Sequence, residues 1–311
     1  MRPRGQSRWC AYGLAAGLLA WAALPFAAKG SEHSEGDAPP GLRMAISESV
    51  AGEVNANDLR VAIKTWAETV ALQTGVRIEP ELCTTAQLVQ RIRNHQVDGF
   101  SLNILEFVRV SSYADREIVV DEAEVPDGSE YLLLVHQSSG IQSLADLRGR
   151  TLLLYENTRT CLARIWLEIL LGSAHLGAVD TFFGRLESNP KLSRVVLPVF
   201  FRHTDACLVT RRGYSTMCEL NPQLAKQLHI LAVSPKLLTT FTAFEKDSPA
   251  ESKRRFLAAI TDLNKTVAGR QALILFGSTR LVQTDVSALR TALDLLHAYD
   301  RLKSKAPAAG Q

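Results

Sequence analysis

The sequence predicts an α/β fold with two lobes, each a mostly parallel sheet flanked by helices. Short apolar runs typical of strands alternate with segments of helical periodicity along most of the chain, which is the pattern of α/β units. The length of 311 residues corresponds to about two domains at roughly 150 residues per domain. Two blocks of this pattern, around Asp98 and Asp205, also resemble each other, which favours two similar lobes.

The first block contains three predicted strands, at 42–46, 76–82 and 97–103. Asn57 can cap a helix between the first two strands, and Gly75 ends this helix. Its apolar face comprises Leu59, Ile63, Trp66 and Val70. Thr84 and Gln87 have the spacing of a capping box, which opens a second helix before the third strand.

The second block contains five predicted strands, at 131–135, 151–155, 181–186, 205–210 and 229–233. The helix after the second of these strands has an apolar face that includes Leu162, Ile165, Trp166, Ile169 and Leu170. Asn189 can cap a further helix, with Pro190 at its first position and a kink at Pro198. Beyond this block, a capping box at 248–251 opens a long helical region, and a last helix begins near residue 285.

Placing Asp98 on Asp205, an offset of 107 residues, aligns the two blocks. The offset matches Leu88, Val89 and Ile92 with Val195, Val196 and Val199. Each block then consists of a helix, a tight turn, an aspartate and a strand. Because open α/β sheets bind ligands beyond the carboxyl ends of their strands, two such lobes facing each other predict a ligand cleft.

Residues 1–30 have the pattern of a secretory signal peptide. Three arginines precede an apolar run from Ala11 to Phe26, and small residues follow it. Cleavage after Ala28 and cleavage after Gly30 are both possible, and an uncleaved anchor is the alternative. In each case we expect the body of the protein to be exported.

The exported part carries no basic excess. The sequence has 35 basic and 32 acidic residues, but four of the basic residues lie within 1–30, which leaves 31 basic residues from Ser31 on. Nucleic-acid-binding proteins carry a basic excess, so this class is excluded. With 46% hydrophobic and 22% charged residues, the chain is neither disordered nor a polytopic membrane protein.

Four cysteines lie beyond the signal segment, at Cys83, Cys161, Cys207 and Cys218. They show neither a C-x-x-C motif nor a clustered spacing. In an oxidising compartment four cysteines allow three complete pairings, and buried free thiols are the alternative. The sequence does not choose between these states.

Three segments together resemble a known family. Gly-Ser-Glu-Tyr at 128–131 runs into the strand at 131–135, Ser-Leu-x-Asp-Leu-x-Gly occupies 143–149, and His-Thr-Asp-Ala occupies 203–206. As an ordered set they resemble the phosphate- and phosphonate-binding family of ABC importers, within the type II class of extracytoplasmic solute-binding proteins. The resemblance covers residues 42 to 300.

The resemblance implies a two-lobed type II periplasmic-binding-protein fold. Lobe 1 would comprise 42–135 plus 236–300 and lobe 2 would comprise 136–235. The signal peptide (1–30) and a flexible, Pro/Gly-rich leader (31–41) would precede them, and a polar tail (301–311) would follow. The resemblance further implies a periplasmic monomer that captures a small polar or anionic ligand, phosphonate- or phosphate-like, between the lobes and delivers it to a membrane permease.

The family cradles its ligand with a turn before the first helix of lobe 2. That turn here comprises Thr158, Arg159, Thr160 and Cys161, with Asn157 before it, and Cys161 stands where the family usually has a glycine. Backbone N–H groups and the dipole at a helix start attract an anion, and the hydroxyls of Thr158 and Thr160 add donors, with plain helix capping as the alternative role. Arg159 departs from the family pattern and either adds a charge-assisted bond or points to water.

The remaining ligand-binding candidates are Ser47, Asn103, Asn189 and Asp205. Asn189 stands where the family has a histidine, and Phe107 stands where it has an aromatic hydroxyl. Asp205 matches the family's cleft aspartate, with a turn aspartate at a strand start as the alternative. A carboxylate about 4 Å from a ligand anion repels it by roughly 4 kcal/mol at an effective dielectric of 20. A ligand held against Asp205 would therefore be protonated or carry an ammonium group.

Motifs of α/β-hydrolases, zinc proteases, P-loop proteins and dinucleotide-binding enzymes do not occur in the sequence. The seven histidines show no ligand spacing, so we expect neither a metal nor a cofactor. Cys161, at a helix start, is the one plausible nucleophile. Three hypotheses follow: the favoured receptor for an importer, a ligand-sensing module for a membrane signalling partner, and a Cys161-dependent enzyme. The sequence does not identify the ligand.

Overall fold

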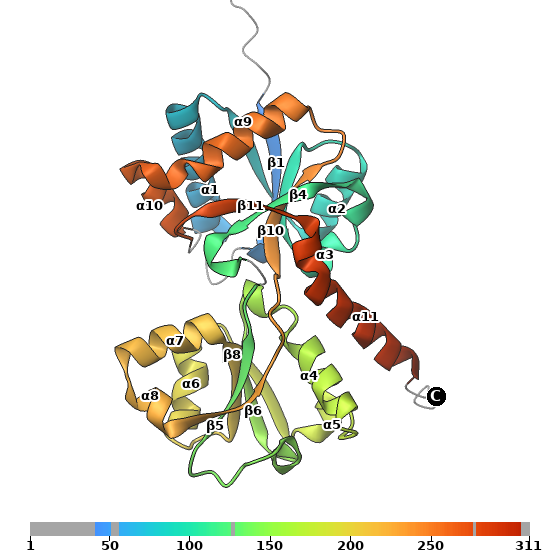
Figure 1. The fold of residues 1–311 in the computed structure, drawn as a ribbon, viewed down its shortest axis with the longest axis vertical. Helices are drawn as coiled ribbons and strands as arrows, with labels where there is room; N and C mark the ends of the chain where they lie inside the picture. The colour runs from blue at the N-terminus through green and yellow to red at the C-terminus, as the bar shows by residue number, and fades with distance from the viewer. Residues whose placement is uncertain (1–40, 51–55, 126–127, 276–277, 306–311) are drawn as a thin grey trace, which may run out of the picture. The chain divides into compact units, whose positions relative to one another are not determined.

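The computed structural model describes residues 41–50, 56–125, 128–275 and 278–305 (Figure 1). The predicted signal peptide, all but the last residue of the predicted leader and the end of the predicted tail lie outside these residues. Within the described ranges, no helix combines the length and the apolar character needed to cross a membrane.

The first lobe contains a six-stranded sheet in the order β11-β4-β10-β3-β1-β2 (Figure 1). Its strands are β1 (Leu42–Ser47), β2 (Ile78–Cys83), β3 (Gly99–Asn103), β4 (Ala114–Asp121), β10 (Thr240–Glu245) and β11 (Leu281–Asp285). Strand β1 pairs in parallel with β2 and β3. The pairs of β10 with β3, β10 with β4 and β11 with β4 are antiparallel.

Helices cover both faces of this sheet. They are α1 (Ala56–Thr74), α2 (Thr85–Arg93), α3 (Ile104–Phe107), α9 (Ala250–Thr261) and α10 (Val267–Leu275). Trp66 of α1 and Phe256 of α9 share a core with Met44 and Phe244 on one face of the sheet. On the other face, α2 buries Leu88 and Ile92 in a core with Phe100.

The second lobe contains a five-stranded sheet in the order β7-β6-β8-β5-β9. Its strands are β5 (Tyr131–His136), β6 (Thr151–Tyr155), β7 (Arg185–Asn189), β8 (Ala206–Thr210) and β9 (Leu228–Val233). Its helices are α4 (Ala163–Ser173), α5 (Val179–Phe182), α6 (Leu192–Phe200), α7 (Arg211–Leu220) and α8 (Gln223–Gln227). Helix α6 buries Val195 and Val199 with Leu134 on one face, whereas α4 buries Trp166 and Leu167 on the other.

Short 3-10 turns complete the described chain. They are η1 (Glu48–Val50), η2 (Ser111–Tyr113), η3 (Glu122–Glu124), η4 (Leu144–Leu147), η5 (Thr158–Thr160), η6 (Leu263–Lys265) and η7 (Val286–Leu289).

The predicted internal repeat is confirmed by the strand order. The order β2-β1-β3-β10-β4 of the first sheet corresponds to β7-β6-β8-β5-β9 of the second, with the same sequence of parallel and antiparallel pairs. The aligned aspartates also play the same part. Asp98 accepts a hydrogen bond from the backbone of Arg43 (2.8 Å), and Asp205 accepts one from the backbone of Thr151 (2.9 Å).

The two-lobed α/β fold is confirmed, and most strands of each sheet run in one direction, although both sheets also contain antiparallel pairings. The first sheet has two parallel and three antiparallel pairings, and the second has two of each, among the described residues. The cause is the chain's path. The chain enters the second lobe with β5 and re-enters the first with β10, and each of these strands runs against both of its neighbours.

The path also corrects the expected lobe boundaries. Strand β5 pairs with β8 and β9, so 131–135 belongs to the second sheet rather than to lobe 1. Its entry segment runs beside the return segment, because Ser129 and Leu237 exchange two backbone hydrogen bonds of 3.1 and 2.9 Å. Gly128 has a φ of +93°, and a Cβ there would lie 2.2 Å from the carbonyl carbon of Leu237, so only glycine fits.

The C-terminal helix α11 (Arg290–Lys305) lies against α4 of the second lobe (Figure 1). Gly172 of α4 permits the approach, since a Cβ there would lie 2.9 Å from Leu302 Cδ1. The expected assignment of 290–300 to lobe 1 and of 301–305 to a polar tail is therefore wrong, because the apolar face of α11 continues to Leu302.

Among the local predictions, one capping box is confirmed and three other predictions are wrong. The capping box of Thr84 and Gln87 is confirmed. The box expected at 248–251 does not form, because Pro249 is the N-cap residue of α9 and no side chain caps that helix. The strand expected at 181–186 is wrong, since α5 ends at Phe182 and β7 begins at Arg185. Asn189 ends β7, and Lys191 is the N-cap residue of α6.

Candidate functional site

A pocket lies at the carboxyl end of the second sheet. Strands β6 and β8 run in parallel and end at Tyr155 and Thr210, and the antiparallel β5 begins at the same end with Tyr131. The pocket has a volume of about 230 Å³. Its lining comprises Ser129, Tyr155, Asn157, Arg159, Leu192, Thr210, Arg212, Gly213, Thr216 and Met217. Two of the predicted residues, Asn157 and Arg159, are thereby brought together with groups from α7.

The predicted turn before α4 is capped from within. Asn157 Oδ1 accepts the backbone N–H of Arg159 (2.8 Å), and the backbone carbonyl of Asn157 accepts the N–H of Thr160 (2.9 Å). The Thr160 hydroxyl donates to backbone carbonyls and accepts the N–H of Asn157 (2.8 Å). Thr158 is half-buried, and its hydroxyl makes no hydrogen bond with a residue that the structure describes. The N–H groups of Asn157, Arg159 and Thr160 are therefore occupied, and Thr158 keeps an available hydroxyl donor.

Two guanidinium groups converge beside the pocket. Arg159 Nη2 and Arg212 Nη1 each lie 3.2 Å from Asp121 Oδ2. The backbone carbonyl of Arg159 accepts a hydrogen bond from the buried Tyr131 hydroxyl (2.7 Å). Burial raises the pKa of Tyr131 well above its usual value, so this hydroxyl stays a donor. The structure thus holds the main chain of Arg159 in place, while its side chain lines the pocket and meets Asp121.

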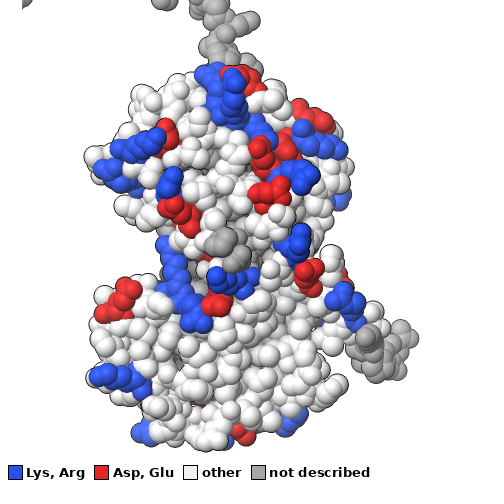
Figure 2. Space-filling model, in the orientation of Figure 1, with Lys and Arg blue, Asp and Glu red and all other residues white. Residues whose placement is uncertain are grey.

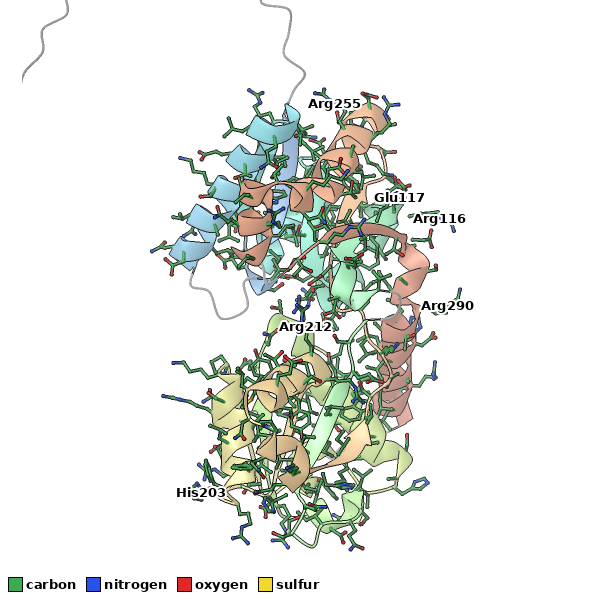
Figure 3. All side chains as sticks on the ribbon, turned by 60° about the vertical axis from the view of Figure 1, so that its left-hand side comes forward. Arg116, Glu117, His203, Arg212, Arg255 and Arg290 are labelled. Atoms are coloured by element: carbon green, nitrogen blue, oxygen red, sulfur yellow. The ribbon has the colours of Figure 1, made fainter. Side chains whose placement is uncertain are left out.

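Arg212 comes from the first turn of α7, which Thr210 caps through the N–H of Gly213 (3.2 Å). Figure 3 shows its side chain projecting from the start of α7 toward the part of the chain that carries β4. Basic side chains gather near α7 on the visible face, with acidic ones beside them (Figure 2). Arg211, the neighbouring residue, pairs instead with Glu130.

The carboxyl end of the first sheet holds a buried carboxylate. Glu106 has 3% of its surface exposed and receives hydrogen bonds from Ser47, Ser49, Thr85 and the backbone of Asn103 at 2.5–3.1 Å. Asn103 in turn caps α3 by accepting the N–H of Glu106 (3.0 Å). The structure therefore brings the predicted Ser47 and Asn103 together, but around an acidic group, which disfavours an anion at this position.

Cys161 lies close enough to Glu106 for this carboxylate to affect it. Burial raises the pKa of Cys161 to about 12, and the charge of Glu106 contributes in the same direction. A thiol with this pKa is protonated at neutral pH and is a poor nucleophile. This observation opposes the thiol-dependent enzyme. The four cysteines beyond residue 30 are all free thiols in the structure.

Asp205 lies at the opposite end of the second sheet from the pocket. It precedes β8, and its carboxylate accepts from the N–H of Thr151, the first residue of β6, with Arg150 Nη1 at 3.5 Å. The expectation that Asp205 lies in the cleft is therefore wrong, and the alternative of a turn aspartate at a strand start holds. Asn189 Oδ1 accepts the N–H of Lys191 (2.9 Å), so this side chain serves its own turn. Phe107 is buried against Phe241 and belongs to the core.

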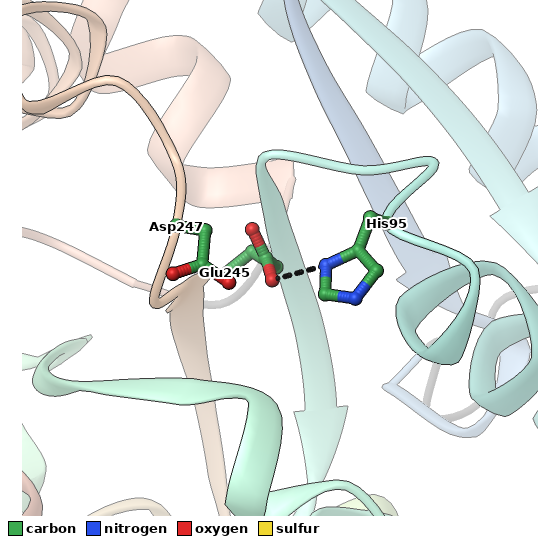
Figure 4. A group of neighbouring side chains, drawn as sticks. All are labelled: His95, Glu245 and Asp247. Atoms are coloured by element: carbon green, nitrogen blue, oxygen red, sulfur yellow. Dashed lines mark hydrogen bonds and ion pairs between the residues drawn. The ribbon is translucent and has the colours of Figure 1, made fainter.

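One group of side chains has the composition of a metal site. Ligand atoms of His95, Glu245 and Asp247 lie within 4.8 Å of one another (Figure 4). His95 Nδ1 and Glu245 Oε1 already form a 2.8 Å hydrogen bond, and His95 and Asp247 are exposed. His95 and Glu245 thus partner each other without a metal, and histidine spacing did not indicate the group because His95 is about 150 residues from the two carboxylates in sequence.

Sequence reasoning missed Arg212, Thr210, Tyr155 and Glu106. The rule that parallel strands present ligand-binding groups at their carboxyl ends would have indicated Arg212, because the strand predicted at 205–210 ends just before it. No sequence pattern indicated a buried role for Glu106, because it lies in an otherwise apolar segment after Asn103.

The chain matches a family model described as "ABC transporter, phosphonate, periplasmic substrate-binding protein" over residues 50–289. A comparison with curated protein sequences finds no match. Several solved structures share the fold. A binding-protein component of an ABC phosphonate transporter from Pseudomonas aeruginosa has 16% identity and a TM-score of 0.59, covering 88% of this chain and 90% of its own.

Two ligand complexes are similar to this chain in fold. PhnD1 from Prochlorococcus marinus in complex with methylphosphonate has 14% identity and a TM-score of 0.58, with 84% of this chain and 98% of PhnD1 covered. A protein from Xanthomonas citri bound to ATP has 15% identity and a TM-score of 0.59, with 85% of this chain and 98% of that chain covered.

Proposed function

The chain belongs to the family of periplasmic substrate-binding proteins of phosphonate ABC transporters, and from this premise we propose that it binds a phosphonate-like anion through Arg159 and Arg212. Members of this family capture small ligands for a membrane permease and are binding proteins rather than enzymes. The remaining question is which residues of this chain hold the ligand.

The convergence of Arg159 and Arg212 on a single oxygen carries the proposal. Two guanidiniums from separate segments, each 3.2 Å from Asp121 Oδ2, form an arrangement that suits an oxyanion. Both residues line the pocket, and Thr158, outside its lining, carries a hydroxyl in the same turn as Arg159. The ligands of the two related complexes, methylphosphonate and ATP, both carry phosphorus-bound oxygens, which supports this ligand class.

The test is a calorimetric titration of methylphosphonate into the wild type, Arg212→Gln and Arg211→Gln. Arg212→Gln should weaken binding at least about tenfold, because a charge-assisted hydrogen bond is worth roughly 1.5–3 kcal/mol. Arg211→Gln removes the same charge one residue away, at a side chain that pairs with Glu130, and should stay within about twofold of the wild type. Equal affinity of all three proteins would show that the ligand binds elsewhere.

We also propose that the protein works in the periplasm as a monomer and delivers its ligand to a permease. The signal pattern of residues 1–30 supports export. We place the first lobe at 42–121 plus 240–289 and the second at 131–233, with α11 packed on the second lobe. Light scattering of the purified protein tests the monomer, and N-terminal sequencing of a periplasmic extract tests cleavage of the signal.

A further inference from the structure

We propose that Asp121 is an internal competitor of the ligand: its carboxylate occupies the anion position between Arg159 and Arg212 and must leave before an oxyanion binds there. The inference rests on the proposed function and deepens it. Asp121 is the last residue of β4, in the first lobe, whereas both arginines belong to the second lobe. Its side chain is 8% exposed, against 27% for Arg159 and 40% for Arg212, so the carboxylate is the most deeply buried of the three groups.

The contacts of Asp121 divide between its two oxygens. Oδ2 meets both guanidiniums at 3.2 Å, while Oδ1 accepts the N–H of Ala123 (3.1 Å) in the turn that follows β4. An incoming oxyanion can therefore take over the two arginine contacts of Oδ2 while the local bond of Oδ1 keeps the carboxylate hydrogen-bonded. This exchange conserves the charge-assisted hydrogen bonds of both arginines.

Glu124 strengthens the competition. Its side chain is 6% exposed, and Oε1 lies 3.5 Å from Arg159 Nε. This buried oxygen has no hydrogen-bond partner among the described residues, so the ion pair with Arg159 is the interaction that offsets its burial. Arg159 is thus flanked by two carboxylates, that of Asp121 at the end of β4 and that of Glu124 in the turn that follows. Among these four side chains the two positive charges are balanced by two negative ones, and an anion has to displace a carboxylate rather than enter an uncompensated positive site.

A competitor at one position has a quantitative consequence. The apparent dissociation constant equals the intrinsic constant divided by the fraction of molecules in which Asp121 has left the arginines. Neutralising Asp121 should therefore raise the affinity for every oxyanion by the same factor. Repulsion from a carboxylate that stays in place would act differently, because a dianion would gain more than a monoanion.

The experiment titrates methylphosphonate and methanesulfonate into the wild type, Asp121→Asn and Asp115→Asn. Asp121→Asn should bind both anions at least about tenfold more tightly, with equal gains for the two. Asp115 also lies on β4 but pairs with Lys253 of the first lobe, so Asp115→Asn should leave both affinities unchanged. Unchanged affinity in Asp121→Asn, or a gain confined to methylphosphonate, would overturn the competition.

A second measurement needs no ligand. Urea unfolding of Asp121→Asn, Arg212→Gln and the double variant should show coupling. If the two effects were independent, the change in the unfolding constant of the double variant would equal the product of the changes in the single variants. We expect the measured constant to differ from this product by at least about fivefold. Additive effects would overturn the ion-pair cluster itself. If coupling is present but neither anion binds the wild type or Asp121→Asn, the proposed ligand class fails while the cluster is supported, so the two failures are distinguishable.

Discussion

The two lobes share a strand order but present opposite chemistry at the carboxyl ends of their sheets. In the first lobe, Glu106 is enclosed by hydroxyls and a backbone N–H, and every predicted polar residue there is engaged with it. In the second lobe, two guanidiniums line a pocket and reach out to a carboxylate of the other lobe. The repeated topology therefore offers a position for a ligand in both lobes. In the first lobe the polar side chains at this position bond to one another, whereas in the second lobe they line a pocket.

The amino ends of the same sheets differ much less. Asp98 and Asp205 each tie the start of one parallel strand to its neighbour and to an arginine. Both aspartates therefore stabilise the repeat, and the role at the ligand that the family resemblance implied for Asp205 does not fit its position at the amino end of β8. The lesson is that a residue shared between the lobes belongs to the fold, whereas the ligand chemistry lies where the lobes differ.

The largest effect that would sharpen this contrast is expected at Glu106. Glu106→Ala removes the acceptor of three hydroxyls and one backbone N–H, so we expect a loss of about 3 kcal/mol or more in the free energy of unfolding. Asn157→Ala, at the capped turn of the second lobe, should cost only about 1 kcal/mol. Urea unfolding at pH 7 measures both, and equal costs would contradict a self-contained first lobe.

A smaller effect compares the two aspartates. Asp98 forms two bonds with the Arg43 side chain, of 2.7 and 3.1 Å, and one with its backbone, whereas Asp205 is more exposed and its arginine contact is 3.5 Å long. Asp98→Asn should therefore destabilise the protein by roughly 1–2 kcal/mol, and Asp205→Asn by less than about 1 kcal/mol after solvent screening. A change in methylphosphonate affinity in Asp205→Asn would return this residue to the ligand site.

Local signals in the sequence predicted much of the fold but only part of the site. The capping box of Thr84 and the apolar face of α1 act within a few residues, so their pattern is visible in the sequence. Strand β4 was missed because its first half is Ala-Asp-Arg-Glu, with polar side chains where a strand pattern would need alternation. The antiparallel pairings of β5 and β10 were not predicted, because alternating elements do not reveal that these strands enter from the other lobe.

The site itself depends on contacts between distant segments. Asp121 meets Arg159 and Arg212 across 38 and 91 residues of chain, and neither spacing is a recognisable motif. Asn157 was predicted because it precedes the turn that the family resemblance places at the ligand, and the structure shows that it caps this turn. Arg212 follows another arginine at a helix start, which is equally typical of a solvated surface, so only the tertiary contact with Asp121 distinguishes it from Arg211.

The smallest expected effect is at Cys161, where the second lobe's helix start faces the acidic end of the first lobe. With a pKa of about 12, roughly one molecule in 10⁴ carries the thiolate at pH 8, so iodoacetamide should leave Cys161 unmodified in the folded protein. The raised pKa stabilises the folded state below the ordinary thiol pKa of about 8.5, and this contribution is lost as pH rises from there toward 12, since the unfolded chain ionises first. Mass spectrometry of the alkylated peptide, with urea-unfolded protein as the control, measures the reactivity. Modification at pH 8 at the rate of the unfolded chain would show that the lobes do not shield this thiol, and it would revive the hypothesis of a thiol-dependent enzyme.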